Sequence, residues 1–127
     1  MIRDISILVV DDLEAMRMSV CSILKHLGFN RVLEAPDGHT ALAMIRSNPV
    51  GLVITDLDMP GMDGLELLQA VRADAVLKDL PVLFMTGEAE KTRVLEAAQA
   101  GVNDYVLKPF TVAVLDQKIR TIFGLNS

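Results

Sequence analysis

The chain has 127 residues, which corresponds to one ordinary domain that can bury a hydrophobic core. Hydrophobic residues make up 51% of it, which excludes a disordered polar chain, while the formal net charge of −5 disfavours binding to nucleic acid. No apolar run approaches the ~20 residues that cross a bilayer and the amino end shows no cleavable signal pattern, so a cytoplasmic protein without membrane insertion is expected.

The first part of the chain contains two strand patterns and two helix patterns. Residues 5–10 are almost continuously apolar, which is typical of a strand that is buried on both faces. Apolar residues at helical spacing follow at Leu13, Met16, Val20, Ile23, Leu24 and Leu27. Gly28 is expected to end that helix, and residues 31–35 predict an outer strand. A second helix is expected to begin after Asp37 and to end before Asn48-Pro49.

The rest of the chain continues the alternation. Residues 52–55 and 82–85 predict two more buried strands, and residues 105–107 predict a second outer strand. Helices are expected at residues 65–72, 91–100 and 112–123. Thr111 is the expected cap of the last helix. The residues of that helix expected to face inward are Val114, Leu115, Ile119 and Ile122.

Five strands that alternate with five helices predict an α/β fold with a parallel sheet covered on both faces. The expected architecture is a (βα)5 flavodoxin-like, doubly wound, five-stranded sheet with strand order 2-1-3-4-5. That order is known for folds of this kind and does not follow from the sequence itself. No repeat, low-complexity tract or interdomain linker interrupts the pattern, so residues 1–127 are expected to form a single domain without an output domain.

Polar side chains follow four of the predicted strands, at Asp11-Asp12, Asp56, Thr86 and Lys108-Pro109. In an open parallel sheet, ligands bind outside the carboxyl ends of the strands, so these groups are expected to share one crevice. Three carboxylates repel one another unless a cation lies between them, and oxygen ligands suit Mg²⁺. An ammonium beside them suits a phosphoryl group, and a carboxylate can be the nucleophile that accepts it. Taken alone, Asp11-Asp12 equally fits a helix cap followed by a first-turn acid.

These residues lie in motifs that resemble the receiver domains of two-component response regulators, along essentially the whole chain. The motifs are Val9-Val10-Asp11-Asp12, Asp56-Leu57-Asp58-Met59-Pro60-Gly61-Met62-Asp63-Gly64, Met85-Thr86-Gly87 and Lys108-Pro109-Phe110. Within that family the chain is most similar to single-domain chemotaxis regulators, through residues 63–68, 97–101 and 105–111. Receiver domains are themselves an example of the strand order given above.

The resemblance implies a phosphorylation-activated signalling switch rather than an enzyme, with at most slow autodephosphorylation. Asp56 would accept a phosphoryl group from a histidine kinase of the chemotaxis type. Asp11, Asp12, Asp56 and the backbone carbonyl of Asp58 would hold Mg²⁺. Asp58 and Glu88 would tune the lifetime of the phosphate. A monomer is implied, with the flagellar motor switch and a phosphatase as further partners.

The resemblance also implies how the switch is thrown. Thr86 would form a hydrogen bond with a phosphoryl oxygen, and Lys108 would form an ion pair with the phosphoryl group. The peptide bond between Lys108 and Pro109 would be cis. Tyr105 would be an aromatic switch, exposed at rest and buried when Thr86 moves. The implied output surface consists of Lys91, Val94, Ala98, Tyr105, Leu107 and Lys118.

Two departures and two alternatives accompany this reading. Leu57 stands where the nearest relatives have tryptophan, and Asp58 stands where they have asparagine. A receiver that serves only as a phosphate sink, or as a relay in a pathway other than chemotaxis, fits the same residues. The Asp-x-Asp pattern at residues 56–58 also fits aspartyl-phosphate hydrolases of the haloacid dehalogenase type, although Pro60 stands where that motif has Thr or Val.

Overall fold

Five parallel strands form one sheet in the order β2-β1-β3-β4-β5, in a computed structural model that describes residues 2–87 and 91–125, without the side chains of Ile2, Lys91, Thr92 and Val94. The strands are β1 Ser6–Val10, β2 Arg31–Ala35, β3 Leu52–Asp56, β4 Val82–Thr86 and β5 Asp104–Leu107. Each differs from its predicted range by at most one residue. The predicted flavodoxin-like order is therefore confirmed.

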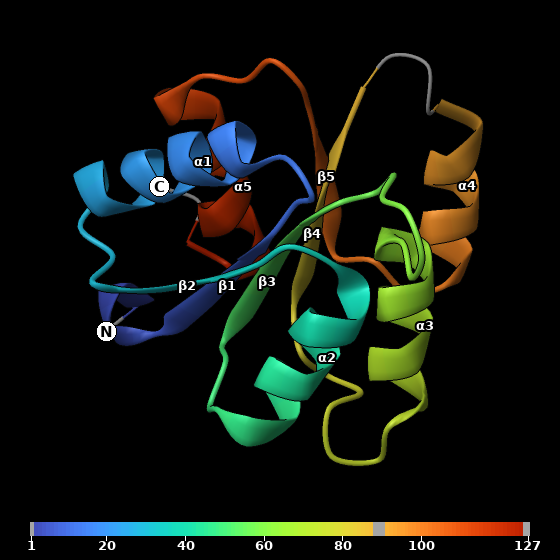
Figure 1. Ribbon diagram of the computed structural model, residues 1–127. Helices are drawn as coiled ribbons and strands as arrows, with labels where there is room; N and C mark the ends of the chain where they lie inside the picture. Colours follow the sequence, from blue (N-terminus) through green and yellow to red (C-terminus); the bar gives the residue numbers. More distant parts are fainter. Residues whose placement is uncertain (1, 88–90, 126–127) are drawn as a thin grey trace.

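The helices cover both faces of the sheet. They are α1 Glu14–His26, α2 Gly38–Ser47, α3 Gly64–Ala73, α4 Lys91–Gln99 and α5 Val112–Ile122, after a short 3-10 helix at Ile2–Asp4. Figure 1 shows α1 and α5 on one face of the sheet and α2, α3 and α4 on the other. Within residues 2–87 and 91–125, no helix has both the length and the apolar character needed to cross a membrane.

The continuous apolar runs of the sequence correspond to strands that are buried on both faces. Ile7 and Val9 of β1 pack in the core on the side of α1 and α5. Leu8 and Val10 alternate with them and pack in the core on the side of α2 and α3. Every residue of β3 and β4 is buried, whereas the outer strands β2 and β5 contain exposed positions. This arrangement explains why the three central strands lack a polar alternation.

The predicted helix ends are largely confirmed by the cap contacts. The Asp37 side chain accepts a hydrogen bond from the backbone N–H of Thr40 at 2.7 Å and caps α2. Thr111 caps α5 in the same way, through the N–H of Val114. Gly28 ends α1 with a φ of 97°, a left-handed conformation that favours glycine.

Two residues expected to face inward are exposed instead. Leu13 is 59% exposed because it is the residue before α1, where its extended backbone directs it away from the apolar stripe of the helix. Val114 is 42% exposed, although it lies next to the buried Leu115. The inward face of α5 follows Leu115 and Ile119, which are four residues apart, so their neighbour Val114 points about 100° away.

Candidate functional site

Three aspartates meet at the carboxyl ends of neighbouring strands. Asp11 and Asp12 follow β1, and Asp56 is the last residue of β3, which pairs directly with β1. One carboxylate oxygen from each residue lies within 4.8 Å of the other two. Asp11 and Asp56 are buried, whereas Asp12 is exposed. The structure thus brings together the three carboxylates that were expected to share one crevice. They lie at the carboxyl ends of β1 and β3, which are at the upper edge of the sheet in Figure 1.

The electrostatic state of Asp11 fits a cation site. Its Oδ1 accepts a hydrogen bond from the backbone N–H of Leu13 at 2.9 Å, but its buried Oδ2 has no hydrogen-bond partner among the described residues. Burial raises the pKa of Asp11, while the Leu13 N–H and the Lys108 ammonium oppose that rise and Asp12 adds to it. An unsatisfied buried carboxylate oxygen beside two further carboxylates is a suitable ligand set for a hard cation such as Mg²⁺.

Lys108 brings a positive charge to the same cluster. Its Nζ lies 3.2 Å from Oδ1 of Asp56, and the two side chains are 20% and 7% exposed. Its backbone N–H donates to the carbonyl oxygen of Thr86 at 2.7 Å, so Lys108 continues the pairing of β5 with β4. The Lys108–Pro109 peptide bond is cis, as expected. The ammonium offsets part of the repulsion among the three aspartates and leaves a cation beside the position of an incoming anion.

Thr86 presents a buried hydroxyl at this edge of the sheet. It is the last residue of β4, and the residue before it, Met85, lies opposite Asp56 in the strand register. The side chain is 0% exposed, and its Oγ1 has no hydrogen-bond partner within residues 2–87 and 91–125. Buried hydroxyls are rarely left unpaired in native proteins, so this group has bonding capacity to offer a ligand.

Two residues that the sequence analysis missed hold the backbone of the site. Arg17 of α1 donates through Nη1 to the carbonyl oxygen of Asp11 at 2.7 Å and through Nε to Glu34 at 3.3 Å. Gly64, the first residue of α3, packs so closely on the carbonyl of Asp56 that a β-carbon would collide with it. Neither contact has a spacing signal in the sequence, because each depends on how the elements pack.

The residues expected to tune the lifetime of a phosphate are placed only in part. Asp58 is exposed on the loop between β3 and α3. The charge of Asp58 acts on Arg93 of α4. The pKa of Arg93 is raised by a hydrogen bond to Asp63 and by the nearby charges of Asp63 and Asp58, despite partial burial of the guanidinium. Glu88 lies outside the described residues.

Three of the six expected output residues, Tyr105, Leu107 and Lys118, line a hollow beside β5 and α5. Tyr105 is 39% exposed and Leu107 is 43% exposed. The Nζ of Lys118 lies 5.3 Å from the centroid of the Tyr105 ring and 3.2 Å from Oδ1 of Asp104. The hollow has a volume of about 380 Å³. Ala98 is exposed, whereas the side chains of Lys91 and Val94 lie outside the described part of the chain.

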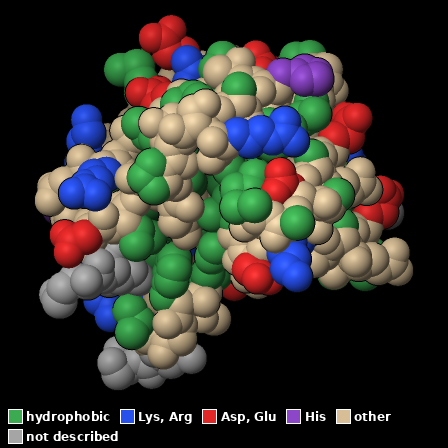
Figure 2. Space-filling view, turned by 90° about the horizontal axis from the view of Figure 1, so that it is seen from below, with side chains coloured by type: hydrophobic (Ala, Val, Ile, Leu, Met, Phe, Trp, Pro, Cys, Tyr) green, Lys and Arg blue, Asp and Glu red, His purple; other side chains and the backbone are tan. Residues whose placement is uncertain are grey.

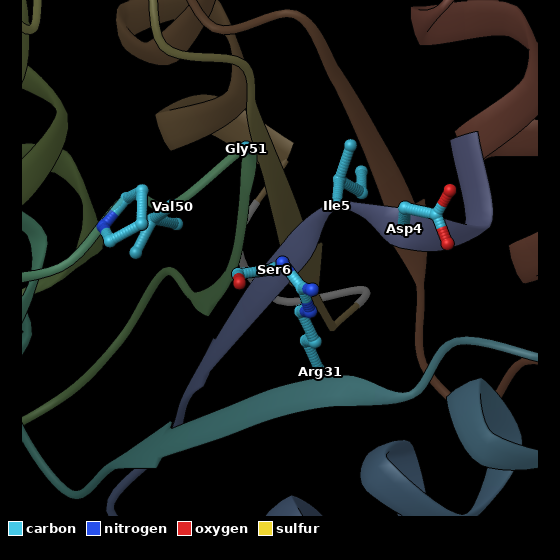
Figure 3. A pocket seen from close by; sticks show the side chains of 7 residues that line it. Asp4, Ile5, Ser6, Arg31, Val50 and Gly51 are labelled. Atoms are coloured by element: carbon cyan, nitrogen blue, oxygen red, sulfur yellow. The ribbon is translucent and has the colours of Figure 1, made fainter. Parts of the chain in front are cut away.

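A second hollow lies at the opposite end of the sheet. It measures about 270 Å³ and is lined by residues at the amino ends of strands, among them Ser6, Arg31 and Gly51 (Figure 3). In Figure 3 the Arg31 side chain extends from β2 toward Ser6 of β1. Seen from below, hydrophobic side chains gather in a central depression with charged groups around it (Figure 2). Because ligands of open parallel sheets bind at the carboxyl ends, the aspartate cluster and not this hollow is the candidate site.

The family model of the response regulator receiver domain matches residues 7–120. The chain belongs to this family. Receiver domains bind Mg²⁺ at an acidic cluster of aspartates, and Asp11, Asp12 and Asp56 form such a cluster here. Receiver domains are signalling proteins rather than enzymes in the usual sense, which sets aside the hydrolase alternative.

Known relatives of this receiver domain are chemotaxis proteins. The chain is 54% identical to the chemotaxis protein CheY of Pseudomonas aeruginosa over 117 residues, which cover 92% of this chain and 94% of that protein. It is 50% identical to chemotaxis protein CheY-3 of Vibrio cholerae over 121 residues, which cover 95% and 93%. Among solved structures, a putative response regulator from Chloroflexus aurantiacus superposes with a TM-score of 0.89 at 30% identity, covering 95% of this chain and 98% of that one. CheY4 of Vibrio cholerae gives 0.86 at 30% identity, covering 94% and 98%.

Proposed function

We propose that this receiver domain is a phosphorylation-activated switch in which Asp56 accepts the phosphoryl group of a histidine kinase. The observation that carries the proposal is the position of Asp56, which is buried beside two other aspartates and in contact with the Lys108 ammonium. Like charges without a counter-ion would repel one another, so the arrangement is suited to a metal ion and an arriving phosphoryl group. We further propose that residues 1–127 act as a single cytoplasmic, monomeric domain.

The transfer would proceed as a displacement at phosphorus. A carboxylate oxygen of Asp56 attacks the phosphorus of phosphohistidine, a P–O bond replaces the P–N bond, and the imidazole leaves with the bonding electron pair and takes up a proton. The Lys108 ammonium stabilises charge on the phosphoryl oxygens. Asp11, Asp12, Asp56 and the Asp58 carbonyl would hold Mg²⁺, which when bound neutralises phosphoryl charge.

Phosphorylation would act on Thr86 and then on the surface of α4, β5 and α5. The phosphoryl group adds charge and acceptor oxygens beside Asp56, and the Thr86 hydroxyl, which has no partner in the described part of the chain, can donate to one of them. Because that bond exists only in the phosphorylated domain, it provides the differential interaction that a population shift requires. Tyr105 would turn inward as Thr86 moves. The surface that then docks to a partner would comprise Lys91, Val94, Ala98, Tyr105, Leu107 and Lys118.

The lifetime of the phosphate would depend on Asp58 and Glu88, with slow autodephosphorylation as the default and a phosphatase as a further partner. The Asp58 carboxylate would disfavour small anionic phosphodonors through charge repulsion. An Asp58→Asn protein should therefore label faster with acetyl phosphate, and an unchanged rate would contradict this role.

The output partner that the similarity to CheY proteins favours is the flagellar motor switch, with a chemotaxis histidine kinase as phosphodonor. A pull-down tests this, with beryllofluoride as the non-covalent stand-in for the phosphoryl group and a motor-switch peptide as bait. We expect capture only in the presence of beryllofluoride and Mg²⁺, and loss of capture in excess chelator. Equal capture with and without beryllofluoride would contradict switching. Phosphorylation of Asp56 without any capture would instead indicate a phosphate sink or a relay in another pathway.

A further inference from the structure

An ion pair ties α4 to the loop that follows the phosphoacceptor strand. Arg93, the third residue of α4, donates through Nη2 to Oδ2 of Asp63 at 2.8 Å. The two side chains are only 29% and 19% exposed, so the pair is partly shielded from water. The same loop carries Asp58, whose charge also acts on Arg93. The guanidinium is thus held by the acidic loop between β3 and α3.

Asp63 connects this ion pair to the backbone of the phosphorylation site. Its Oδ1 accepts a hydrogen bond from the backbone N–H of Glu66 at 2.9 Å, and the Glu66 carboxylate accepts one from the backbone N–H of Asp63 at 3.3 Å. The two bonds make a capping box at the start of α3. The next residue, Gly64, packs directly on the Asp56 carbonyl. One carboxylate therefore caps α3 beside Asp56 with one oxygen and holds α4 with the other.

The start of α4 is also linked to Thr86 along the chain. β4 ends at Thr86 and α4 begins at Lys91, so only residues 87–90 separate the hydroxyl that would contact a phosphoryl oxygen from the first turn of α4. Arg93 lies in that first turn. A shift of this turn away from α3 must stretch or break the bond between Arg93 and Asp63.

We propose that Arg93 is a positioning residue of the switch, which through Asp63 holds α4 in the arrangement of the unphosphorylated domain. This inference rests on the proposed function of Asp56 as phosphoacceptor. The ion pair is present in the unphosphorylated domain and opposes the switched arrangement. Part of the free energy gained from the contact between Thr86 and the phosphoryl group therefore goes into breaking the ion pair. By linkage, loss of the pair must strengthen the binding of a phosphoryl analogue to the site.

The test is a titration of beryllofluoride at saturating Mg²⁺, followed by fluorine NMR of the bound analogue. We expect Arg93→Gln to bind beryllofluoride about two- to fivefold more tightly than the wild type, the range that a partly exposed ion pair can contribute. Asp63→Asn keeps an oxygen that can cap α3 and removes the charge, so it should act like Arg93→Gln. The double variant should add nothing further, and Arg93→Lys should return toward the wild type.

The matched control is Arg46→Gln, because Arg46 pairs with Asp74 at 3.8 Å between α2 and the far end of α3. It should leave beryllofluoride affinity unchanged. Unchanged or weaker affinity in Arg93→Gln, even with a lower melting temperature, would show a merely structural pair and overturn the proposal. If the wild type itself binds no beryllofluoride, the proposed function fails instead, so the two failures are distinguishable.

Discussion

Lys108 Nζ contacts Oδ1 of Asp56 at 3.2 Å across the end of β4, which lies between β3, where Asp56 is the last residue, and β5, which Lys108 follows. The contact joins the residue that follows the last strand to the aspartate cluster. Both partners are largely shielded from solvent, so the loss of either leaves the other poorly compensated. The contact therefore places the Lys108 ammonium where a new charge on Asp56 would act on it directly.

Lys108→Ala should separate phosphorylation from its output. The three aspartates remain in this variant, so labelling by acetyl phosphate should still occur. The variant has no ammonium to form an ion pair with the phosphoryl group on Asp56. Beryllofluoride-dependent capture by the motor-switch peptide should fall at least about tenfold, which corresponds to about 1.4 kcal/mol. Lys78→Ala, which removes an exposed lysine far from the cluster, is the control. Undiminished capture by the Lys108 variant would argue against its role.

Thr86→Val and Thr86→Ser should have opposite effects on stability and switching. The hydroxyl of Thr86 has no hydrogen-bond partner at rest among the residues that the structure describes, so Val should leave the free energy of unfolding unchanged or raise it by up to about 1 kcal/mol. Ser loses a buried methyl group and should cost about 1 kcal/mol. Only Ser retains the donor for the phosphoryl oxygen, so beryllofluoride should trigger capture of Ser and not of Val. Denaturant unfolding and the pull-down measure the two effects, and a fully responsive Val variant would refute the assignment.

Asp11→Asn should stabilise the fold near neutral pH. Burial raises the pKa of Asp11 above its unfolded value, so the stability provided by the protonated carboxyl is present in acid and is lost as the pH rises through the native pKa. Asn is neutral throughout, so its advantage over the wild type should shrink as the pH falls. Denaturant unfolding at neutral and acid pH checks this, and an advantage that grows in acid would contradict it.

Magnesium should make the wild type more stable than Asp11→Asn. At one hundred times its dissociation constant, Mg²⁺ should stabilise the wild type by about 2.7 kcal/mol, because it binds only the folded cluster. Asp11→Asn lacks one ligand and should lose most of this gain. Equal stabilisation of both proteins by Mg²⁺ would argue against Asp11 as a ligand.

Gly64→Ala should disturb the site more than a comparable glycine substitution does. A β-carbon at Gly64 would collide with the Asp56 carbonyl and lie 2.9 Å from the Leu57 α-carbon, so we expect a cost of about 1–3 kcal/mol and slower labelling. Gly61→Ala is the control, since Gly61 has a φ of 73° but open space around it. It should cost only about 1 kcal/mol of backbone strain and label normally. Similar labelling rates in the two variants would show that Gly64 does not position Asp56.

The sheet could be predicted because its central strands are buried on both faces, which leaves long apolar runs in the sequence. Strand ends were less predictable, since Asp56 and Thr86 are polar and fall outside those runs although their backbones still pair with neighbouring strands. Leu13 was expected inward because apolar spacing does not show where a helix begins. Its extended backbone before α1 turns it outward.

The aspartate cluster could be predicted because parallel strands carry their carboxyl ends to one edge. The contacts of Arg17 with the Asp11 carbonyl and of Arg93 with Asp63 could not. Each contact joins a helix to a loop whose path is determined by packing. The sequence shows that these arginines lie on helices, but it does not show which residue each of them contacts. The residues that carry the chemistry were thus accessible from sequence, but those that hold them in place were not.

The central claim is tested most directly by intact-protein mass spectrometry after treatment with acetyl phosphate and Mg²⁺. The wild type should gain the mass of one phosphoryl group, and Asp56→Asn should gain none while remaining folded. Asp58→Asn, which removes an exposed carboxylate two residues away, is the matched control and should still gain one phosphoryl group, faster than the wild type. Labelling of Asp56→Asn at the wild-type rate would contradict the account.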